Sequence, residues 1–194
     1  MKKRVFCSVT MALMLGGCGT GQPKEPDFPR YTGEYLHIAY IGKAPEVRED
    51  NVRLKEISFT ELKNRKQVAS TFDAVMIMPN KLLEADQGEY ADTYLKMRIP
   101  TFFIGSNKGH VPFIADWISY KEAAGETTDY AAGYLNGKTT LFWTYGLYND
   151  VKTKRHITAM YSNVFQTVET VKKQTTAVSE KTLFRHHVGM VFYV

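Results

Sequence analysis

The fold of this chain is decided by two apolar runs, Phe72-Asp-Ala-Val-Met-Ile-Met-Pro79 and Ile99-Pro-Thr-Phe-Phe-Ile-Gly105. Both are apolar at nearly every position, whereas a strand with one solvated face alternates apolar and polar residues. Such runs are typical of strands buried on both faces of a parallel sheet. The segment between them, 80–98, predicts a helix that begins after Asn80 as its cap and breaks near Gln87-Gly88. This strand–helix–strand unit indicates a right-handed parallel crossover and therefore an α/β fold.

The segments around this unit extend the pattern. Further strands are expected over 35–42, 52–57 and 139–148, and further helices over 60–69, capped by Thr60, and over 153–173. Residues 182–194 are expected to form a final strand or an apolar tail. Residues 120–136 predict mostly loop with a short helix near 130–135, because glycine and threonine are frequent there. Together these elements predict one α/β domain, residues 35–194, with three layers and a mainly parallel sheet of four to six strands, flavodoxin- or Rossmann-like in its layering.

The chain begins with a leader typical of exported proteins. Three basic residues, 2–4, precede an apolar run over 5–15 that is too short to span a membrane, because a spanning helix needs about 20 residues. The run ends in Leu15-Gly16-Gly17-Cys18, which resembles the lipobox of bacterial lipoproteins. The resemblance implies that residues 1–17 are a signal peptide and that Cys18 becomes the lipidated first residue of the mature protein. The alternative is an ordinary secretory signal in which Cys18 occurs by chance.

Residues 18–34 predict a tether between this anchor and the folded domain. Pro23, Pro26 and Pro29 recur among polar residues, which favours an extended chain of about 3.1 Å per residue. Two acyl chains on Cys18 are enough for stable anchoring, because each buried methylene contributes about 0.8 kcal/mol. The sequence therefore predicts a domain held at the extracytoplasmic face of the cell membrane.

The charge of the mature chain argues against nucleic-acid binding. The full sequence has 25 Lys and Arg against 20 Asp and Glu, a net charge of +5. Removal of Lys2, Lys3 and Arg4 with the signal peptide leaves 22 basic against 20 acidic residues, a net charge of +2. Cys7 leaves as well, so no disulfide can form within the mature chain. No nucleic-acid partner is therefore expected.

Candidate ligand-binding residues follow the two buried runs. In open parallel sheets, ligands bind beyond the carboxyl ends of the strands. Asn80 stands at that place after the first run, and Ser106, Asn107 and His110 stand there after the second. The alternative is that this second group belongs to a turn built from turn-favouring residues.

Other chemistries have weaker support in the sequence. Gly42-Lys43 lacks the glycine spacing of a phosphate-binding loop or a dinucleotide fingerprint, so no cofactor is expected. Ser106 with His110 would be an esterase-like pair, but no Gly-x-Ser-x-Gly motif surrounds the serine, so no catalytic residue is assigned. No metal is expected either, because zinc-site spacing is absent among the histidines, His37, His110, His156, His186 and His187.

The body of the chain is similar to small uncharacterised lipoproteins of Bacillus-type Gram-positive bacteria in the stretches Ile57-Ser-Phe-Thr-Glu-Leu, Phe72-Asp-Ala-Val-Met-Ile and Ile99-Pro-Thr-Phe-Phe-Ile-Gly. This resemblance implies a plasma-membrane location and brings no activity with it. The expected function is non-enzymatic: a membrane-tethered domain that binds a partner protein or a cell-envelope ligand. The alternatives are a solute-binding lipoprotein, although the body has room for only one lobe, and, with less support, a hydrolase.

Overall fold

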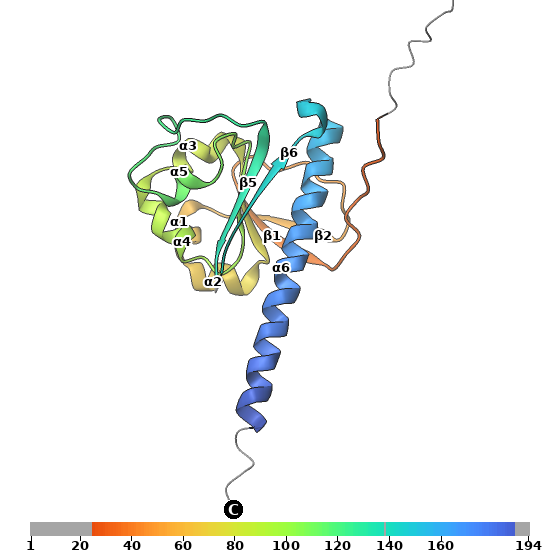
Figure 1. The fold of residues 1–194 in the computed structure, drawn as a ribbon, viewed down its shortest axis with the longest axis vertical. Coiled ribbons are helices and arrows are strands. Elements are labelled where there is room, and N and C mark those ends of the chain that lie inside the picture. Colours follow the sequence, from red (N-terminus) through yellow and green to blue (C-terminus); the bar gives the residue numbers. More distant parts are fainter. Residues whose placement is uncertain (1–24, 138, 189–194) are drawn as a thin grey trace, which may run out of the picture.

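The computed structural model describes residues 25–137 and 139–188, with side chains up to residue 177. The predicted signal peptide and Cys18 lie outside the described residues, as does 189–194, the end of the predicted final strand. Six strands of the described chain form one sheet in the order β2-β1-β3-β4-β5-β6 (Figure 1). They are β1 (Leu36–Ile41), β2 (Val52–Glu56), β3 (Ala74–Ile77), β4 (Thr101–Ile104), β5 (Asp129–Asn136) and β6 (Thr140–Gly146).

The sheet is mixed. β2, β1, β3 and β4 are parallel, whereas β5 is antiparallel to β4 and β6 is antiparallel to β5. The α/β class is thus confirmed, and the prediction of a mainly parallel sheet is only partly right. The reason lies after β4, where α5 (Val111–Ile114) is too short to carry the chain back along the sheet. Asn136 pairs with Thr140, so β5 and β6 form a hairpin with a short connection.

β5 corrects the prediction for residues 120–136, which placed a loop and a short helix there. Its small residues, among them Ala132 and Gly133, give a weak apolar signal, yet they are buried in the strand. A Cβ atom on Gly133 would lie 2.7 Å from ring atoms of Phe102 on β4 and 3.0 Å from Trp143 on β6. Glycine here marks the close approach of two aromatic rings.

Helices lie on both faces of the sheet (Figure 1). One face carries α6 (Lys154–Val188), and the other carries α5 together with α1 (Phe59–Lys63), α2 (Arg65–Thr71), α3 (Leu82–Ala85) and α4 (Ala91–Leu95). Side chains alternate along β3 accordingly: Ala74 and Met76 join the cluster under α6, and Val75 and Ile77 join the cluster on the other face. This alternation explains why the sequence over 72–79 is apolar at nearly every position.

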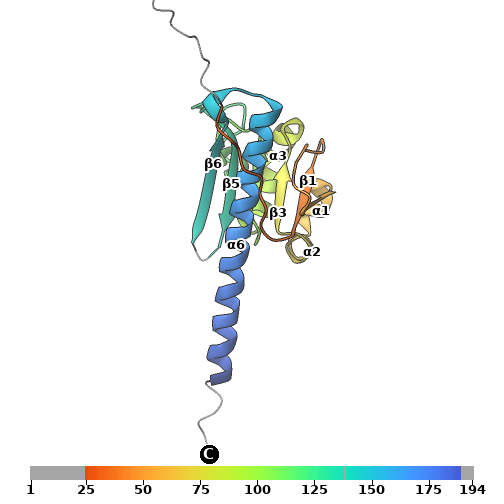
Figure 2. The same cartoon turned by 90° about the vertical axis from the view of Figure 1, so that its right-hand side faces the viewer.

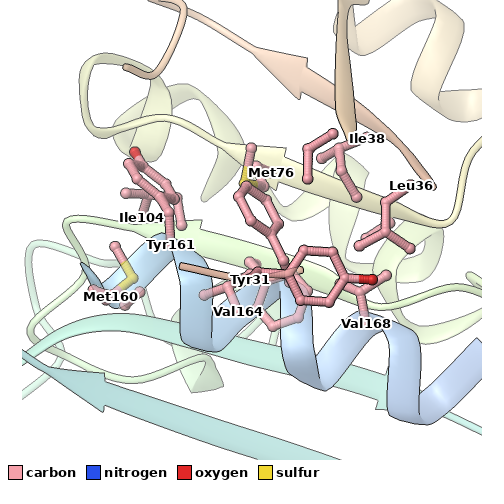
Figure 3. Close-up of a cluster of buried hydrophobic side chains, with 14 of the residues drawn as sticks. Tyr31, Leu36, Ile38, Met76, Ile104, Met160, Tyr161, Val164 and Val168 are labelled. Atoms are coloured by element: carbon pink, nitrogen blue, oxygen red, sulfur yellow. The ribbon is translucent and has the colours of Figure 1, made fainter. Parts of the chain in front are cut away.

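Figure 3 shows the cluster between α6 and the sheet. Val164 and Val168 of α6 pack beside Leu36 and Ile38 of β1, and the ring of Tyr31 lies among them. All five side chains are buried. Burying a side chain of this size stabilises a fold by about 1.5–3 kcal/mol, so this cluster fixes α6 on the sheet.

The helices on the opposite face lie near the predicted positions, with differences in their ends. The helix predicted over 60–69 is divided at Asn64 into α1 and α2. Asn80 is not the predicted cap, because it lies in the 3-10 turn before α3 and Lys81 is the N-cap of α3. The chain between β3 and β4 forms α3 and α4 with short 3-10 turns before each, and the predicted break at Gln87-Gly88 is confirmed. The predicted cap at Thr60 is wrong. Ser58 caps α1 through a capping box, in which its side chain accepts from the Glu61 amide and the Glu61 carboxylate accepts from the Ser58 amide.

α6 is longer than predicted. The sequence predicts a helix that ends at 173 and a strand or an apolar tail from 182, whereas α6 continues to Val188. Neither glycine nor proline occurs between 154 and 188, so nothing in the backbone chemistry ends the helix when its apolar stripe ends at Val171. The last turns of α6 therefore extend past the sheet (Figure 1).

The N-terminal part of the described chain packs on α6. Glu25 Oε1 lies 3.2 Å from His156 Nε2, and Arg155 Nη2 donates to the Pro26 carbonyl at 3.0 Å. The sequence predicts a tether over 18–34, but in the structure residues 25–34 belong to the body, because Tyr31 is buried in the α6-side cluster. The chain enters beside the first turn of α6 (Figure 2).

Candidate functional site

The strand order creates a crevice between β1 and β3. From β1 the chain passes to β2 over the α6 face, where Val47 packs against the α6-side cluster. From β3 it passes to β4 over the opposite face, where Leu82 and Tyr94 are buried. The two connections thus diverge from neighbouring carboxyl ends. In α/β sheets such a topological switch point is where ligands bind.

A hydrogen bond ties the two connections together at this point. Asn80 Oδ1, after β3, accepts from the Lys43 amide, after β1, at 3.0 Å. Gly42 has φ +114°, and a Cβ atom there would lie 2.6 Å from Asn80 Oδ1. Glycine is therefore required at position 42, both by its backbone conformation and by the closeness of the Asn80 side chain.

An open pocket of about 540 Å³ lies at the α6 side of this switch point, and we call it the switch-point pocket. Its volume falls within the range of about 300–1,000 Å³ that is typical of small-molecule sites. Its lining includes residues of the β1 and β3 connections, of β5, of the segment before α6 and of α6 itself: Lys43, Ala44, Glu46, Met78, Asn80, Tyr130, Lys152, Lys154, Ile157 and Tyr161.

Tyr161 presents a hydroxyl group to this pocket. The residue is 3% exposed, and its hydroxyl makes no hydrogen bond within the part of the chain that is described. The buried side-chain oxygens that lack a partner there are Asp86 Oδ1 and Thr101 Oγ1, so the Tyr161 oxygen retains access to solvent. In Figure 3, the Tyr161 hydroxyl points away from Leu36 and Val168 at the far end of the cluster. The ring is thus fixed by the core while the oxygen is free for a ligand.

Burial keeps this phenol protonated. Desolvation raises the pKa of Tyr161 well above its usual range, and the neighbouring Tyr130 adds to the rise. Burial also raises the pKa of Tyr130. Both hydroxyls are therefore hydrogen-bond donors at neutral pH.

Three lysines and one glutamate give the pocket its charge. Lys152 Nζ lies 5.2 Å from the centre of the Tyr130 ring, a cation–π distance. Lys154 forms an ion pair with Glu46 and lowers the pKa of that carboxyl. Lys43 makes no ion pair with any described residue. The excess of positive charge favours an anionic ligand.

The structure separates the residues predicted for this site. Asn80 lines the switch-point pocket, whereas Ser106, Asn107 and His110 do not. The Ser106 hydroxyl is fully buried and donates to the Gly109 carbonyl at 2.8 Å. Asn107 Oδ1 accepts from the Tyr120 hydroxyl at 3.2 Å. In these contacts the polar groups of the loop form hydrogen bonds with the loop and with its neighbour Tyr120.

His110 packs in an aromatic stack. Its ring centre lies 5.4 Å from that of Tyr134 on β5 and 5.5 Å from that of Phe142 on β6, with the rings close to parallel. Burial lowers the pKa of His110. No hydrogen bond between Ser106 and His110 is present in the described structure. The imidazole is therefore positioned by its neighbours as a neutral ring.

Sequence reasoning missed most of the pocket. Lys43 is considered there only as part of a phosphate-binding loop, whose spacing it does not fit. The sequence predicts a short helix around Tyr130 and a helix over 153–173 that includes Tyr161, and neither residue is expected in a ligand site. Lys152 and Lys154 carry a usable signal, because lysines at the start of a helix that follows a strand and covers the sheet lie at the sheet's carboxyl edge.

Comparisons with protein families, with curated proteins and with solved structures gave no match to this chain. No helix within residues 25–137 and 139–188 has the length and apolar character to cross a membrane. The same ranges contain no group of three or more His, Cys, Asp or Glu residues arranged to hold a metal ion.

Proposed function

We propose that this protein is a lipid-anchored extracytoplasmic binding domain and that the switch-point pocket is its ligand site. The observation that carries the proposal is the Tyr161 hydroxyl, which is held rigidly by the core, open to the pocket and without a partner in the described chain. A protonated phenol in that position can donate a hydrogen bond to a ligand. The excess of lysines around it supports the same use.

The pocket favours a small ligand or a small group of a larger molecule over a flat protein surface. A concave site that combines apolar walls with a few converging polar groups is typical of small-molecule recognition. A cell-envelope ligand fits this description, and so does a free solute. We therefore place the cell-envelope ligand first and the solute second.

The lipid anchor is part of the proposal because of the leader. The lipobox-like Leu15-Gly16-Gly17-Cys18 follows a basic and apolar segment, and its cysteine is the expected site of acylation. We further propose a three-layer, flavodoxin-like arrangement for the parallel half of the sheet. The order β2-β1-β3-β4 and the helices on both faces support it.

Two measurements test the proposal separately. Metabolic labelling with palmitate is expected to mark the wild type and not Cys18→Ser, and absence of label from the wild type would contradict the anchor. A thermal-shift screen of envelope components and solutes is expected to find ligands that raise Tm in the wild type but not in Ala44→Trp. Ala44 is an exposed residue that lines the pocket, so the indole fills the site without disturbing the core. A ligand that stabilises both forms equally would place binding elsewhere.

A further inference from the structure

We propose that the switch-point pocket takes an amphipathic organic anion, a molecule with an oxyanion group such as a carboxylate and an apolar body. This inference rests on the proposed function and adds the chemical class of the ligand. It is carried by three features of one cavity: uncompensated ammonium groups, phenol donors and apolar walls. The ammonium groups and the phenols would bind the oxyanion, and the apolar walls would contact the rest of the molecule.

The ammonium groups define the anionic end. Lys43 and Lys152 form no ion pair with a carboxylate of the described residues, whereas Lys154 is already paired with Glu46. Lys43 and Lys152 reach the pocket from different segments, one after β1 and one before α6. A charge-assisted hydrogen bond to an oxyanion is roughly twice as strong as a neutral one, so two free ammonium groups select strongly for charge.

The tyrosines add direction to this charge. Lysine binds an anion as a mobile point charge, whereas a phenol fixed in a core donates along one line. Tyr161 is 3% exposed and lies beside Ile104 at one end of the core (Figure 3). Tyr130 stands next to it and is covered by Lys152. The oxygen atoms of a bound anion can therefore accept hydrogen bonds from the tyrosine hydroxyls as well as from the lysine ammonium groups.

The apolar walls define the other end of the ligand. Met78 is buried at 4% exposure, and Ile157 packs against the α6-side cluster while lining the pocket. A free inorganic anion would occupy only a small part of the 540 Å³ cavity and would leave these walls in contact with water. An aromatic or aliphatic body removes that apolar surface from water at about 25 cal/mol per Å².

The test uses a matched pair of small probes, 2-naphthoate and 2-naphthamide, which share the ring system and differ in charge. Each is titrated calorimetrically into the full lipidated chain in detergent, with the detergent blank subtracted. We expect the naphthoate to bind about 10-fold more tightly than the amide. In Lys43→Gln/Lys152→Gln this preference should fall to about 2-fold or less, and in the exposed control Lys66→Gln/Lys121→Gln it should remain. Tyr161→Phe should weaken naphthoate binding about 3- to 10-fold with Tm preserved.

Each of the other possible results would contradict one part of this inference. Equal binding of both probes, lost in Ala44→Trp, would overturn the anionic class and leave the pocket as the site. Binding of inorganic phosphate as tight as that of the naphthoate would overturn the apolar body. Binding of the naphthoate that Ala44→Trp does not reduce, or no binding of either probe, would overturn the inference itself. In the last case a ligand from the thermal-shift screen would still uphold the proposed function.

Discussion

The side chain of Asn80 bridges the two diverging connections of the sheet by accepting a hydrogen bond from the Lys43 amide at 3.0 Å. Asn80→Ala should lower the free energy of unfolding by about 1 kcal/mol, because the amide loses its acceptor at a partly solvated position. Asn80→Asp should retain most of the stability, since a carboxylate oxygen can accept the same bond. Urea denaturation of the three proteins measures the difference, and equal losses in Ala and Asp variants would contradict this role of the acceptor.

Glu49 and Ser162 form a buried polar contact between the β1–β2 connection and α6. The Ser162 hydroxyl donates to Glu49 Oε1 at 2.6 Å, and the Arg48 amide donates to Glu49 Oε2 at 3.0 Å. Ser162→Ala should lower the free energy of unfolding by about 1–3 kcal/mol, because it removes a donor from a buried carboxylate. Urea denaturation measures the loss. Ser70→Ala on the exposed side of α2 is the control, and a loss as large there would show that the contact is not the cause.

Gly133 is the place where the rings of Phe102 and Trp143 meet β5. Gly133→Ala should destabilise the fold by about 1–3 kcal/mol, because the new methyl group would lie 2.7 Å from Phe102 ring atoms in a packed core. The measurement is the midpoint of thermal unfolding. Gly146→Ala at the end of β6 is the matched control, since a Cβ atom there has no neighbour within 4 Å. A stable Gly133→Ala protein would contradict the tight packing of the two rings.

The aromatic stack around His110 should make stability depend on pH. Burial lowers the pKa of His110 in the folded protein below the value of about 6.5 that it has in the unfolded chain. The unfolded state therefore binds the proton more readily, and the contribution of His110 to stability is lost as the pH falls from about 7 through the folded pKa. His110→Gln should flatten this part of the pH dependence.

The measurement for His110 is the free energy of unfolding in urea at several pH values between 7.5 and 5. His37→Gln is the control, because His37 is exposed on β1. A loss of stability toward pH 5 that is the same in His110→Gln and in the wild type would show that other groups cause it.

The central strands could be predicted because they need no partner to be recognised. β3 and β4 are apolar on both faces, and helices cover each face of the sheet. An unbroken apolar run in the sequence therefore indicates a strand that is buried on both faces. β5 could not be recognised in this way. Its alanines and Gly133 are buried because Phe102 and Trp143 come from other strands to cover them, and that depends on tertiary structure.

The same distinction applies to the candidate site. Asn80 could be found because it follows a strand whose end is visible in the sequence. Tyr130, Lys152 and Tyr161 could not be assembled, because they come from an antiparallel strand and from a helix whose position on the sheet the sequence did not give. The loop Ser106–His110 had the polar groups of a site, but its hydrogen bonds are made within its own surroundings.

Glu25 packs on Arg155 and His156 at the first turn of α6. Six residues separate Cys18 from Glu25, and an extended chain covers at most about 3.6 Å per residue. If Cys18 carries acyl chains, Glu25 lies at most about 25 Å from the lipidated residue. Lipidation of Cys18 would thus hold the first turn of α6, and the switch-point pocket that Lys154 and Ile157 line, close to the lipid headgroups.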